Sequence, residues 1–495
     1  MHSHRKTLAV AAATTTALAL LTMPAQGAPN PNNPEKMAKA VEVADVMDHL
    51  EAFQDIADSH DGNRGAGTSG YDASGAYVED TLRAAGYDTQ RQWFDFTYFE
   101  VVSSSLTVGG SPIDENVMSY SPSTPVGGVT GPLAAPAVAT GCAAGDWAGF
   151  PAGSVALISR GACAFGVKAA NAKTAGAVAA VVYNNEEGEL HGTLGGPGDY
   201  APATGITQAD GKALLARLGE TTTFEAQTVL EERSTFNVLA ETDKGRDDNV
   251  VMMGAHLDSV NDGPGINDNG TGSAALLETA VQLAKANKLN NKLRFAWWGA
   301  EEHGLLGSEH YVADLKENDP AALEDIATYL NFDMVGSPNH IIGVYDADQS
   351  TYEADVDVPE GSAETEDVLT DWFDSQDQAW VDTPFSGRSD YAAFIDAGIP
   401  SSGLFTGADD VKTEEQEDLF GGTAGIILDP NYHTPEDDIS NLNVDALDVM
   451  SDAIAASAIL LAQDTSDINN KRSRGKSGKP GPDVVVMEHV AHHLR

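Results

Sequence analysis

The chain has 495 residues, of which 42% are hydrophobic, and a formal net charge of −47 from 75 acidic and 28 basic residues. A chain of this length exceeds one ordinary hydrophobic core, so we expect one large domain and one smaller domain. A surface this acidic repels nucleic acid and anionic lipid, which excludes nucleic acid and membrane surfaces as partners.

Residues 1–27 have the pattern of a signal peptide. A basic run at 2–6 precedes an apolar stretch at 8–21, and small residues at 25–28 supply a cleavage site. The apolar stretch has about fourteen residues, whereas a membrane-spanning helix needs roughly 20. We therefore expect a secreted, soluble protein, and we expect it to be a monomer.

Residues 36–105 are expected to form the first part of a catalytic domain. Apolar residues recur at helical spacing from Met37 to Leu82, apart from a Gly-containing loop at 61–67. A strand is predicted over 94–102. This order of helices and strand is typical of the entry into an α/β domain.

The amino-acid composition changes over residues 106–232, which are expected to form a small inserted β-rich domain. They are rich in Gly, Ala, Val and Pro, with short apolar strands at 155–158 and 179–183 and one helix at 167–175. Titratable residues with catalytic pairing are missing from this segment. The chemistry is therefore expected elsewhere in the chain.

The chain has two cysteines, Cys142 and Cys163, and both lie in the insert. Neither belongs to a CxxC pair of the metal-binding type, and export would place them in an oxidising compartment. A structural disulfide is therefore favoured over a metal-ligand role or a free catalytic thiol. The bond would close a loop of about twenty residues and stabilise the fold by roughly 3 kcal/mol.

Residues 233–465 return to long apolar strands that alternate with helices. This pattern predicts a mostly parallel central sheet with helices on both faces, the continuation of the α/β catalytic domain. The predicted elements are a strand at 250–255, a helix at 272–286, a strand at 293–298, a helix at 305–315, a strand at 329–335 and a closing helix at 445–461.

The C-terminal segment, 466–495, differs from the acidic body that precedes it. It carries a basic, Gly- and Ser-containing run at 471–479. A tail of this composition is expected to be disordered, and removal as a propeptide is the alternative.

Several side chains able to bind a metal lie at strand ends or in loops of the second half of the chain. They are His256, Asp268, Glu302, Asp333 and His433. Ligands bind at the carboxyl ends of strands in open α/β sheets. Two imidazoles and three carboxylates satisfy two zinc ions if one carboxylate bridges them, which leaves each metal an open position. The other residues each have an ordinary explanation as a cap, turn or surface residue, whereas Asp333 in an apolar strand is harder to explain as a surface residue. The ordered set favours a metal centre.

Two neighbours of these ligands suit supporting roles. Asp258 follows His256 by two residues in an extended strand, so it can accept the second ring N–H of His256 or make another bond that supports the site. Glu301 and Glu302 are adjacent carboxylates at a strand end. One can bind zinc while the other faces water as a general base, and a solvated acidic pair is the alternative reading.

These motifs, in this order, resemble those of the M28 di-zinc aminopeptidases, and especially the secreted leucine aminopeptidases of streptomycete type. The resemblance extends from about Met37 to Leu461 apart from the insert, which resembles a protease-associated (PA) domain, as in relatives of aminopeptidase Y. Besides the ligand settings, the shared motifs are GNR at 62–64, RAAGY at 83–87, GRSDYAAF at 387–394, GLFTGAD at 403–409 and GGTAG at 421–425.

The resemblance implies a zinc-exopeptidase fold and a division of the ligands. One zinc would take His256 and Asp333, the other would take Glu302 and His433, and Asp268 would bridge them. It also implies a cis peptide bond between Asp268 and Asn269. The substrates would be peptides and proteins with a free N-terminus, with a preference for large hydrophobic residues such as Leu.

The resemblance further implies roles around the metals. Glu301 would be the general base, and Tyr432 would help to stabilise the tetrahedral intermediate. The wall that receives the amino terminus and side chain of the substrate would include Arg388, Asp390 and Phe405.

Some streptomycete relatives also carry a structural calcium ion. Asp448 and Asp452 match two of its ligand positions and lie one helical turn apart. The third position falls at about Ala40, which has no acidic side chain. An exposed acidic helix face is the alternative to a calcium site.

Two alternatives to an aminopeptidase stay open. One is another zinc enzyme of this fold, such as a glutaminyl cyclase, which works with one zinc, or a glutamate carboxypeptidase, which adds a membrane anchor and a helical domain. The other is a non-catalytic binding protein, which would require a broken ligand set. A serine hydrolase is disfavoured because the chain has no GxSxG motif.

Overall fold

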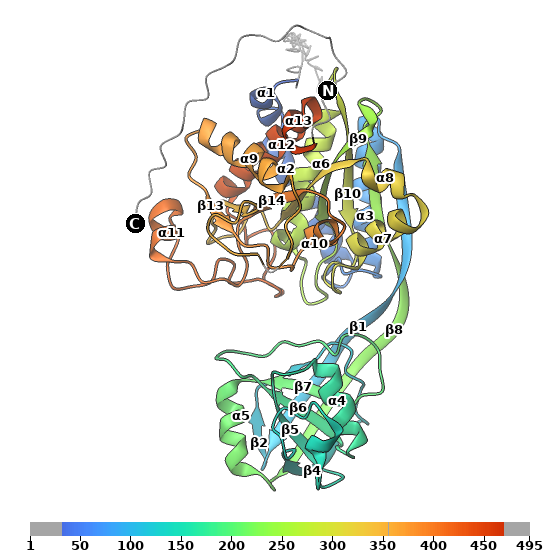
Figure 1. Cartoon of the computed structure of the whole chain (residues 1–495), viewed down its shortest axis with the longest axis vertical. Helices are drawn as coiled ribbons and strands as arrows, with labels where there is room; N and C mark the ends of the chain where they lie inside the picture. The colour runs from blue at the N-terminus through green and yellow to red at the C-terminus, as the bar shows by residue number, and fades with distance from the viewer. Residues whose placement is uncertain (1–31, 355, 470–495) are drawn as a thin grey trace, which may run out of the picture.

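The structure is a computed structural model that describes residues 32–354 and 356–469. The predicted signal peptide and the basic run at 471–479 lie outside the described residues. Within the described residues, no helix has the length and apolar character needed to cross a bilayer. Figure 1 shows two modules, a larger one above and a smaller one below, joined by a long two-stranded ribbon.

A mixed sheet forms the centre of the larger module. Its strands run in the order β13-β12-β14-β11-β9-β10-β8, and the central pairs β9–β10, β9–β11 and β11–β14 are parallel. The strands are β8 (Thr221–Glu241), β9 (Arg246–His256), β10 (Asn291–Trp298), β11 (Ile326–Asp333), β12 (Gly343–Tyr345), β13 (Val381–Thr383) and β14 (Ser401–Phe405).

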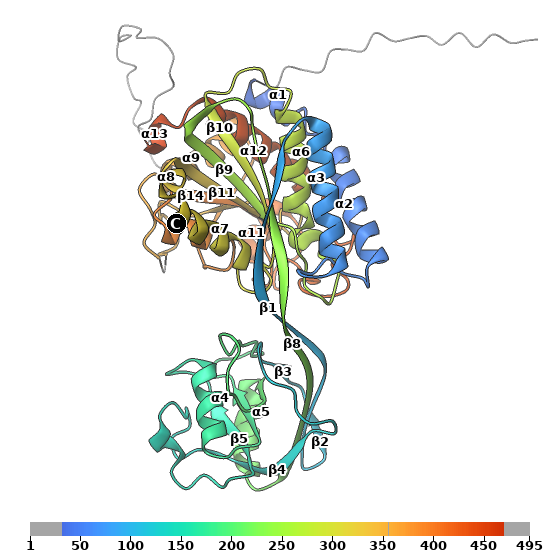
Figure 2. The same cartoon turned by 90° about the vertical axis from the view of Figure 1, so that its right-hand side faces the viewer.

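Helices cover both faces of this sheet (Figure 2). One face packs against α1 (Pro34–Ala38), α2 (Val43–Ser59), α3 (Ser69–Ala85), α6 (Gly272–Leu283), α9 (Ser362–Ser375), α12 (Val444–Gln463) and α13 (Ser466–Asn469). The other packs against α7 (Leu306–Asn318), α8 (Pro320–Glu324) and α10 (Tyr391–Asp396), while α11 (Glu414–Phe420) lies in a later loop. The predicted α/β architecture is confirmed.

Alternation along β9 explains how one strand serves two cores. Val251 and Met253 belong to the core beneath the larger group of helices, whereas Met252 belongs to the core on the opposite face. Successive side chains of a strand point to opposite faces, so a strand buried on both sides is apolar throughout. This is why the sequence shows near-continuous apolar runs here.

The smaller module contains the segment predicted as an insert. Its elements are β2 (Ser111–Ile113), β3 (Asn116–Val117), β4 (Val129–Ala134), η1 (Ala144–Trp147), β5 (Val155–Ser159), α4 (Phe165–Thr174), β6 (Ala179–Tyr183), β7 (Ala203–Ile206), α5 (Gln208–Leu214) and η2 (Leu215–Arg217). The parallel neighbours β5, β6 and β7 pack their apolar faces into cores separate from those of the larger module.

The strand predicted over 94–102 is much longer in the structure. It is β1 (Thr89–Val108), which pairs with β8 almost throughout and has a register shift between Val101 and Ser103. Residues 101–105 are exposed, so hydrophobic alternation stops there although the strand continues. Pairing with β8, rather than burial, sustains this part of the ribbon, and the sequence pattern carries no signal of it.

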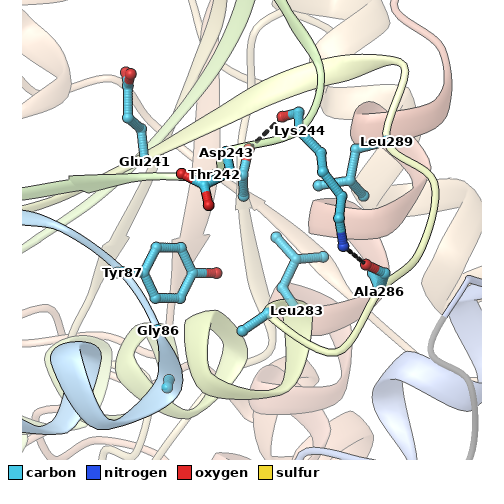
Figure 3. A pocket seen from close by; sticks show the side chains of 11 residues that line it. Gly86, Tyr87, Glu241, Thr242, Asp243, Lys244, Leu283, Ala286 and Leu289 are labelled. Atoms are coloured by element: carbon cyan, nitrogen blue, oxygen red, sulfur yellow. Dashed lines mark hydrogen bonds between the residues drawn. The ribbon is translucent and has the colours of Figure 1, made fainter.

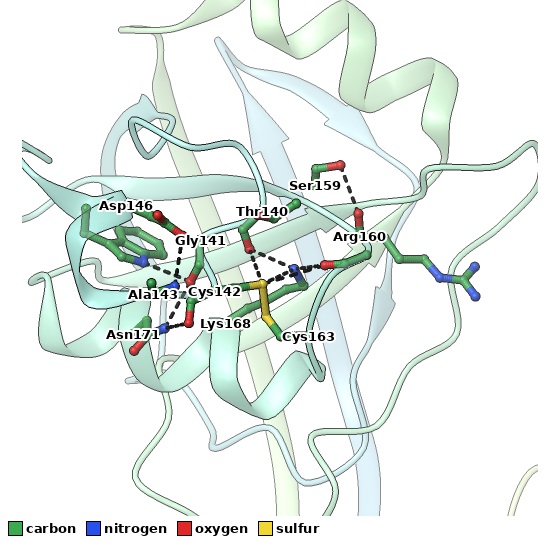
Figure 4. The surroundings of a disulfide bond; sticks show 12 residues. Thr140, Gly141, Cys142, Ala143, Asp146, Ser159, Arg160, Cys163, Lys168 and Asn171 are labelled. Atoms are coloured by element: carbon green, nitrogen blue, oxygen red, sulfur yellow. Dashed lines mark hydrogen bonds between the residues drawn. A yellow bond between two sulfur atoms is a disulfide. The ribbon is translucent and has the colours of Figure 1, made fainter.

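The predicted disulfide between Cys142 and Cys163 is present (Figure 4). Beside it, the buried Lys168 ammonium donates to the carbonyl oxygens of Thr140 and Gly161 at 2.8 and 2.7 Å. Asn171 donates to the Cys142 carbonyl at 2.9 Å. The bond and these contacts tie the loops around 140 and 161 to α4.

The direction of the strands determines which end of the sheet meets the smaller module. The strand β8 rises from the smaller module, and β10 is antiparallel to it, so β10 runs back toward that module. Because β9 and β11 are parallel to β10, their carboxyl ends also point that way. The edge where the candidate ligands lie therefore faces the smaller module.

Replacing both cysteines, as Cys142→Ser with Cys163→Ser, is expected to lower the stability of the smaller module by about 3 kcal/mol, because the reduced loop gains conformational freedom when unfolded. Calorimetry should show the transition of that module shifted to lower temperature while the transition of the larger module stays in place. Unchanged transitions for both modules would contradict a stabilising role for the bond.

Candidate metal centre

Three strand ends bring predicted ligands to one edge of the sheet. His256 is the last residue of β9, Asp333 is the last residue of β11, and Glu301 and Glu302 lie three and four residues beyond the end of β10. The strand predicted to run to residue 335 ends at Asp333 because Met334 has a positive φ of 48°, which turns the chain out of the sheet.

Two loops complete the set. Asp268 lies in the segment Ile266–Thr271 that leads into α6, where its own backbone angles are not helical (φ −106°, ψ 94°), and the Asp268–Asn269 peptide is cis, as predicted. His433 lies in the loop between α11 and α12 and has a positive φ of 59°. The predicted ligands and Glu301 line one cavity at this edge.

The ligand atoms meet around the carboxylate of Asp268. Its Oδ1 lies 3.1 Å from His256 Nε2, and its Oδ2 lies 3.1 Å from His433 Nε2. Asp333 Oδ1 approaches His256 Nε2 to 3.4 Å, and Glu302 Oε2 approaches His433 Nε2 to 3.1 Å. The arrangement is two imidazoles, each with its own carboxylate, on either side of a shared carboxylate.

The backbone fixes the orientation of His256. Its Nδ1 lies 3.1 Å from the Asp258 carbonyl oxygen, which can only accept, so Nδ1 carries the proton and Nε2 is directed at the carboxylates. The Asp258 carboxylate, predicted as a possible partner of this ring, is 3.8 Å away. It accepts instead from the backbone N–H groups of Glu301 and Glu302, at 3.2 and 3.3 Å. Asp258 thus supports the site by holding the turn after β10.

A relay of hydrogen bonds, which the sequence analysis missed, orients Asp333. Ser389 Oγ donates to Asp333 Oδ2 at 2.6 Å and accepts from the Asn331 amide at 2.8 Å. Tyr329 Oη in turn donates to Asn331 Oδ1 at 2.8 Å. The available signal was alternation, because Tyr329, Asn331 and Asp333 are polar at every second position of a buried strand.

A second missed feature ties the His433 loop to the Asp268 loop. The Asp437 carboxylate accepts from the backbone N–H groups of Asn267 and Asp268, at 2.9 and 3.0 Å. The Asn441 amide donates to both Asp437 and Asp429. Two ligands about 165 residues apart in the chain are thereby held in one frame.

The residues present fit a divalent cation. Asp333 Oδ1 and Glu302 Oε1 are buried and have no hydrogen-bond partner among the described residues. Groups of three ligand side chains lie within reach of one ion, namely His256 with Asp268 and Glu302, and His256 with Glu301 and Asp333. Buried carboxylates in this number need positive charge, and the mixture of imidazole and carboxylate suits zinc.

The pKa shifts of Glu301 and His433 also indicate that the buried carboxylates of the site lack positive charge nearby. Burial raises the pKa of Glu301 well above its usual range, and the neighbouring carboxylates reinforce the shift against the opposing effect of His256. Burial alone would lower the pKa of His433, but Glu302 and Asp268 raise it to about 11. Each imidazole therefore sits where a positive charge is stabilised.

Three further predicted residues also line the cavity. Tyr432 stacks on the His433 ring at 3.8 Å between centroids. Arg388 binds Asp409 at 2.9 Å and approaches Tyr432 Oη to 3.4 Å. Phe405 stands on the wall near Tyr345, with ring centroids 6.3 Å apart.

Asp390 is a correction to the predicted wall. It is fully buried and does not line the cavity. It occupies the N-cap position of α10, where its side chain turns into the module, and burial raises its pKa to about 7.

The predicted calcium positions do not form a ligand cluster. Asp448 and Asp452 lie on α12, and the described residues hold no third ligand side chain within reach of both. Burial raises the pKa of Asp452 to about 6, and the neighbouring Lys39 opposes that shift.

Figure 3 shows a separate small pocket. Its lining includes Glu241, the last residue of β8, and because β8 runs antiparallel to β10 it lies at the opposite end of the sheet from the candidate ligands. It lies between Tyr87, the turn after β8 and the end of α6, where Lys244 Nζ donates to the Ala286 carbonyl at 2.6 Å. None of the predicted site residues lines it. The metal-type cluster and this pocket are thus at different ends of the module.

Comparison with known proteins identifies two family models in this chain. Residues 237–458 match Peptidase family M28, and residues 129–214, inside the smaller module, match the PA domain. The chain is 44% identical over 419 residues to a probable lipoprotein aminopeptidase, LpqL, of Mycobacterium tuberculosis, covering 83% of each chain. It is 41% identical over 421 residues to leucine aminopeptidase 2 of Trichophyton rubrum, covering 84% of this chain and 83% of that one.

Solved structures give the same result. An aminopeptidase from Aneurinibacillus sp. strain AM-1 superposes with a TM-score of 0.69 at 27% identity, covering 86% of this chain and 95% of that one. A zinc aminopeptidase from Bacillus subtilis superposes with a TM-score of 0.63 at 26% identity, covering 85% and 95%. The chain therefore belongs to peptidase family M28, carries a PA domain, and is a hydrolase of the aminopeptidase type.

Proposed function

We propose that this chain is an exported di-zinc aminopeptidase that removes large hydrophobic residues such as Leu from free N-termini. The observation that carries the proposal is the Asp268 carboxylate, with one oxygen 3.1 Å from each imidazole Nε2. A carboxylate shared in this way suits two metal ions better than one. The catalytic domain would comprise 36–105 and 233–465, with 106–232 as the PA domain.

The ligands would be divided between two zinc ions according to which side chains lie close together. His256 and Asp333 would hold one zinc, Glu302 and His433 the other, and Asp268 would bridge. Zinc, when bound, supplies Lewis-acid chemistry that polarises a carbonyl oxygen and makes water acidic near neutral pH. The chain itself keeps the ligands fixed through the backbone carbonyl of Asp258, the Ser389 hydroxyl and the Asp437 carboxylate.

Glu301 is proposed as the general base. It lines the cavity, and the Asp258 carboxylate accepts from its backbone N–H, which holds the turn that carries it. The proposed ligand set is complete without it. It would take a proton from the attacking water and pass it to the amine that leaves when the peptide bond breaks.

Tyr432 is proposed to stabilise the charge that develops on the carbonyl oxygen. Burial raises the pKa of its hydroxyl far above neutrality, with added effects of Asp268 and Glu302, so it stays protonated and can donate. Its ring is held against His433, and Arg388 lies 3.4 Å from its hydroxyl. Donors fixed in advance in this way cost no reorganisation during the reaction.

The amino group and the side chain of the substrate's N-terminal residue would be recognised by different parts of the cavity. The excess of carboxylates attracts the ammonium group of a free N-terminus, while the apolar wall around Phe405 and Tyr345 receives the side chain. Relatives named leucine aminopeptidase support a preference for Leu.

Glu301→Ala is expected to keep both zinc ions and to lose a factor of about 10³ or more in kcat, because the proton acceptor is gone while the ligands remain. Metal analysis and hydrolysis of leucine p-nitroanilide measure the two quantities. Glu415→Ala, on the exposed side of α11, is the matched control and should behave as the unchanged enzyme. Near-normal kcat for Glu301→Ala would remove Glu301 from this role.

Chelation is expected to abolish hydrolysis, and titration with zinc should restore it with two equivalents per chain. Asp268→Asn, which removes the shared negative charge, should lower the zinc content below two and kcat by at least about 100-fold. Zinc analysis of the dialysed proteins gives the zinc content, and hydrolysis of leucine p-nitroanilide gives kcat. Full activity with a single equivalent would favour a one-zinc enzyme instead.

Blocked substrates test recognition of the amino terminus. Leucine p-nitroanilide is expected to be the best of a panel with Phe, Lys and Pro anilides, and its N-acetyl form should be cleaved at least about 100-fold more slowly because it lacks the ammonium charge. Initial rates give kcat/KM for each. Comparable rates for the acetylated and free substrates would contradict an aminopeptidase.

A further inference from the structure

Arg64 is a buried cation that the proposed chemistry does not use. It lies in the loop between α2 and α3, is fully buried, and has its guanidinium 5.0 Å from the centroid of the Phe53 ring. Burying a charge is costly unless its donors are satisfied. In the described part of the chain, no carboxylate lies within ion-pair distance of it, so its contacts must be of another kind.

The guanidinium binds backbone carbonyls of one segment, 257–265. Its Nε donates to Pro264 at 2.9 Å, its Nη2 donates to Gly265 at 2.6 Å, and its Nη1 donates to Leu257. The Arg64 backbone N–H also donates to Ser259 Oγ at 2.9 Å. All four acceptors lie between His256 and Asp268 in the sequence. Arg64 therefore fixes the course of the backbone that links these two proposed ligands.

The positive charge of Arg64 also affects carboxylates at and around the proposed metal centre. Burial lowers its pKa to about 10, against the attraction of Asp258, Asp437 and Asp268, so the group is charged at neutral pH. It offsets part of the repulsion among those carboxylates without occupying the position of a metal. Gly265, one of its acceptors, also accepts from the Gly270 N–H at 3.0 Å, which places the effect at the turn that carries Asp268.

We propose that Arg64 is a positioning residue that shapes the 257–265 segment and thereby sets His256 and Asp268 for metal binding before the metal arrives. The inference rests on the proposed metal centre. The planar fork is essential to it, because a lysine has the same charge but cannot reach three carbonyls in one plane. Arg64→Lys therefore separates the geometry of the group from its charge.

The test compares zinc binding by wild type, Arg64→Lys and a control. Calorimetric titration of the zinc-free proteins is expected to show zinc affinity about 10- to 100-fold weaker for Arg64→Lys, with a lower kcat at saturating zinc and KM changed less than about twofold. Arg294→Lys is the control, since Arg294 binds Glu241 and Tyr311 on the outer side of β10. It should lower the melting temperature without changing zinc affinity.

The outcomes separate this inference from the proposed function. Wild type that binds no zinc would overturn the metal centre and this role of Arg64 with it. Wild type that binds zinc, together with Arg64→Lys of equal zinc affinity and kcat, would overturn the role of Arg64 alone.

A measurement on the unaltered chain covers the case in which Arg64→Lys does not fold. Hydrogen exchange of zinc-free wild type should show the amide of Gly270 already protected, because the segment is set without metal. Protection that develops only on adding zinc would overturn the proposal.

Discussion

The structure of the larger module depends on one constraint, the concentration of buried carboxylates at a single edge of the sheet. Asp258, Asp268, Glu301, Glu302 and Asp333 meet there, and each is buried or nearly so. Such groups repel one another and lose hydration, so each needs a donor or a cation. The surrounding chain supplies donors that leave specific oxygens free: backbone N–H groups for Asp258, a hydroxyl for Asp333, and imidazoles for Asp268 and Glu302. Of these five carboxylates, Glu302 and Asp333 each keep one oxygen, Oε1 and Oδ1, without a hydrogen-bond partner among the described residues.

The connection to the smaller module follows from the same edge. The aromatic residues Phe94, Phe96 and Tyr98 of β1 form a core with Ala300, next to Glu301. Phe96 also lies 5.0 Å from the ring of His303, the residue after Glu302. The ribbon that leaves for the PA domain is therefore packed on the turn that presents Glu301 and Glu302. The PA domain faces the site because the strand directions require it, and the ribbon that attaches it packs on the loop that carries Glu301 and Glu302.

How far the sequence predicts this arrangement depends on the range of the interactions. The strands that lead to His256 and Asp333 follow from local apolar patterns, although β11 ends at Asp333, two residues before its pattern predicts. The grouping of the ligands at one site follows from the resemblance of the ordered motifs to a known family. The partner of the Asp258 carboxylate, the Ser389 relay and the Asp437 frame join segments separated by about 40 to 170 residues, for which no local pattern exists. Arg64 is visible in the sequence only as part of GNR, and Asp390 only as part of GRSD. Neither motif shows whether its charged residue is buried or reaches the cavity, because burial depends on packing against distant parts of the chain.

The central claim is that Asp268 is shared by two metal ions. A crystal of the zinc-loaded protein, measured on both sides of the zinc absorption edge, tests it most directly. Two anomalous peaks are expected, one beside His256 and Asp333 and the other beside Glu302 and His433, with the Asp268 carboxylate between them. A single peak, or peaks that do not contact Asp268, would contradict it.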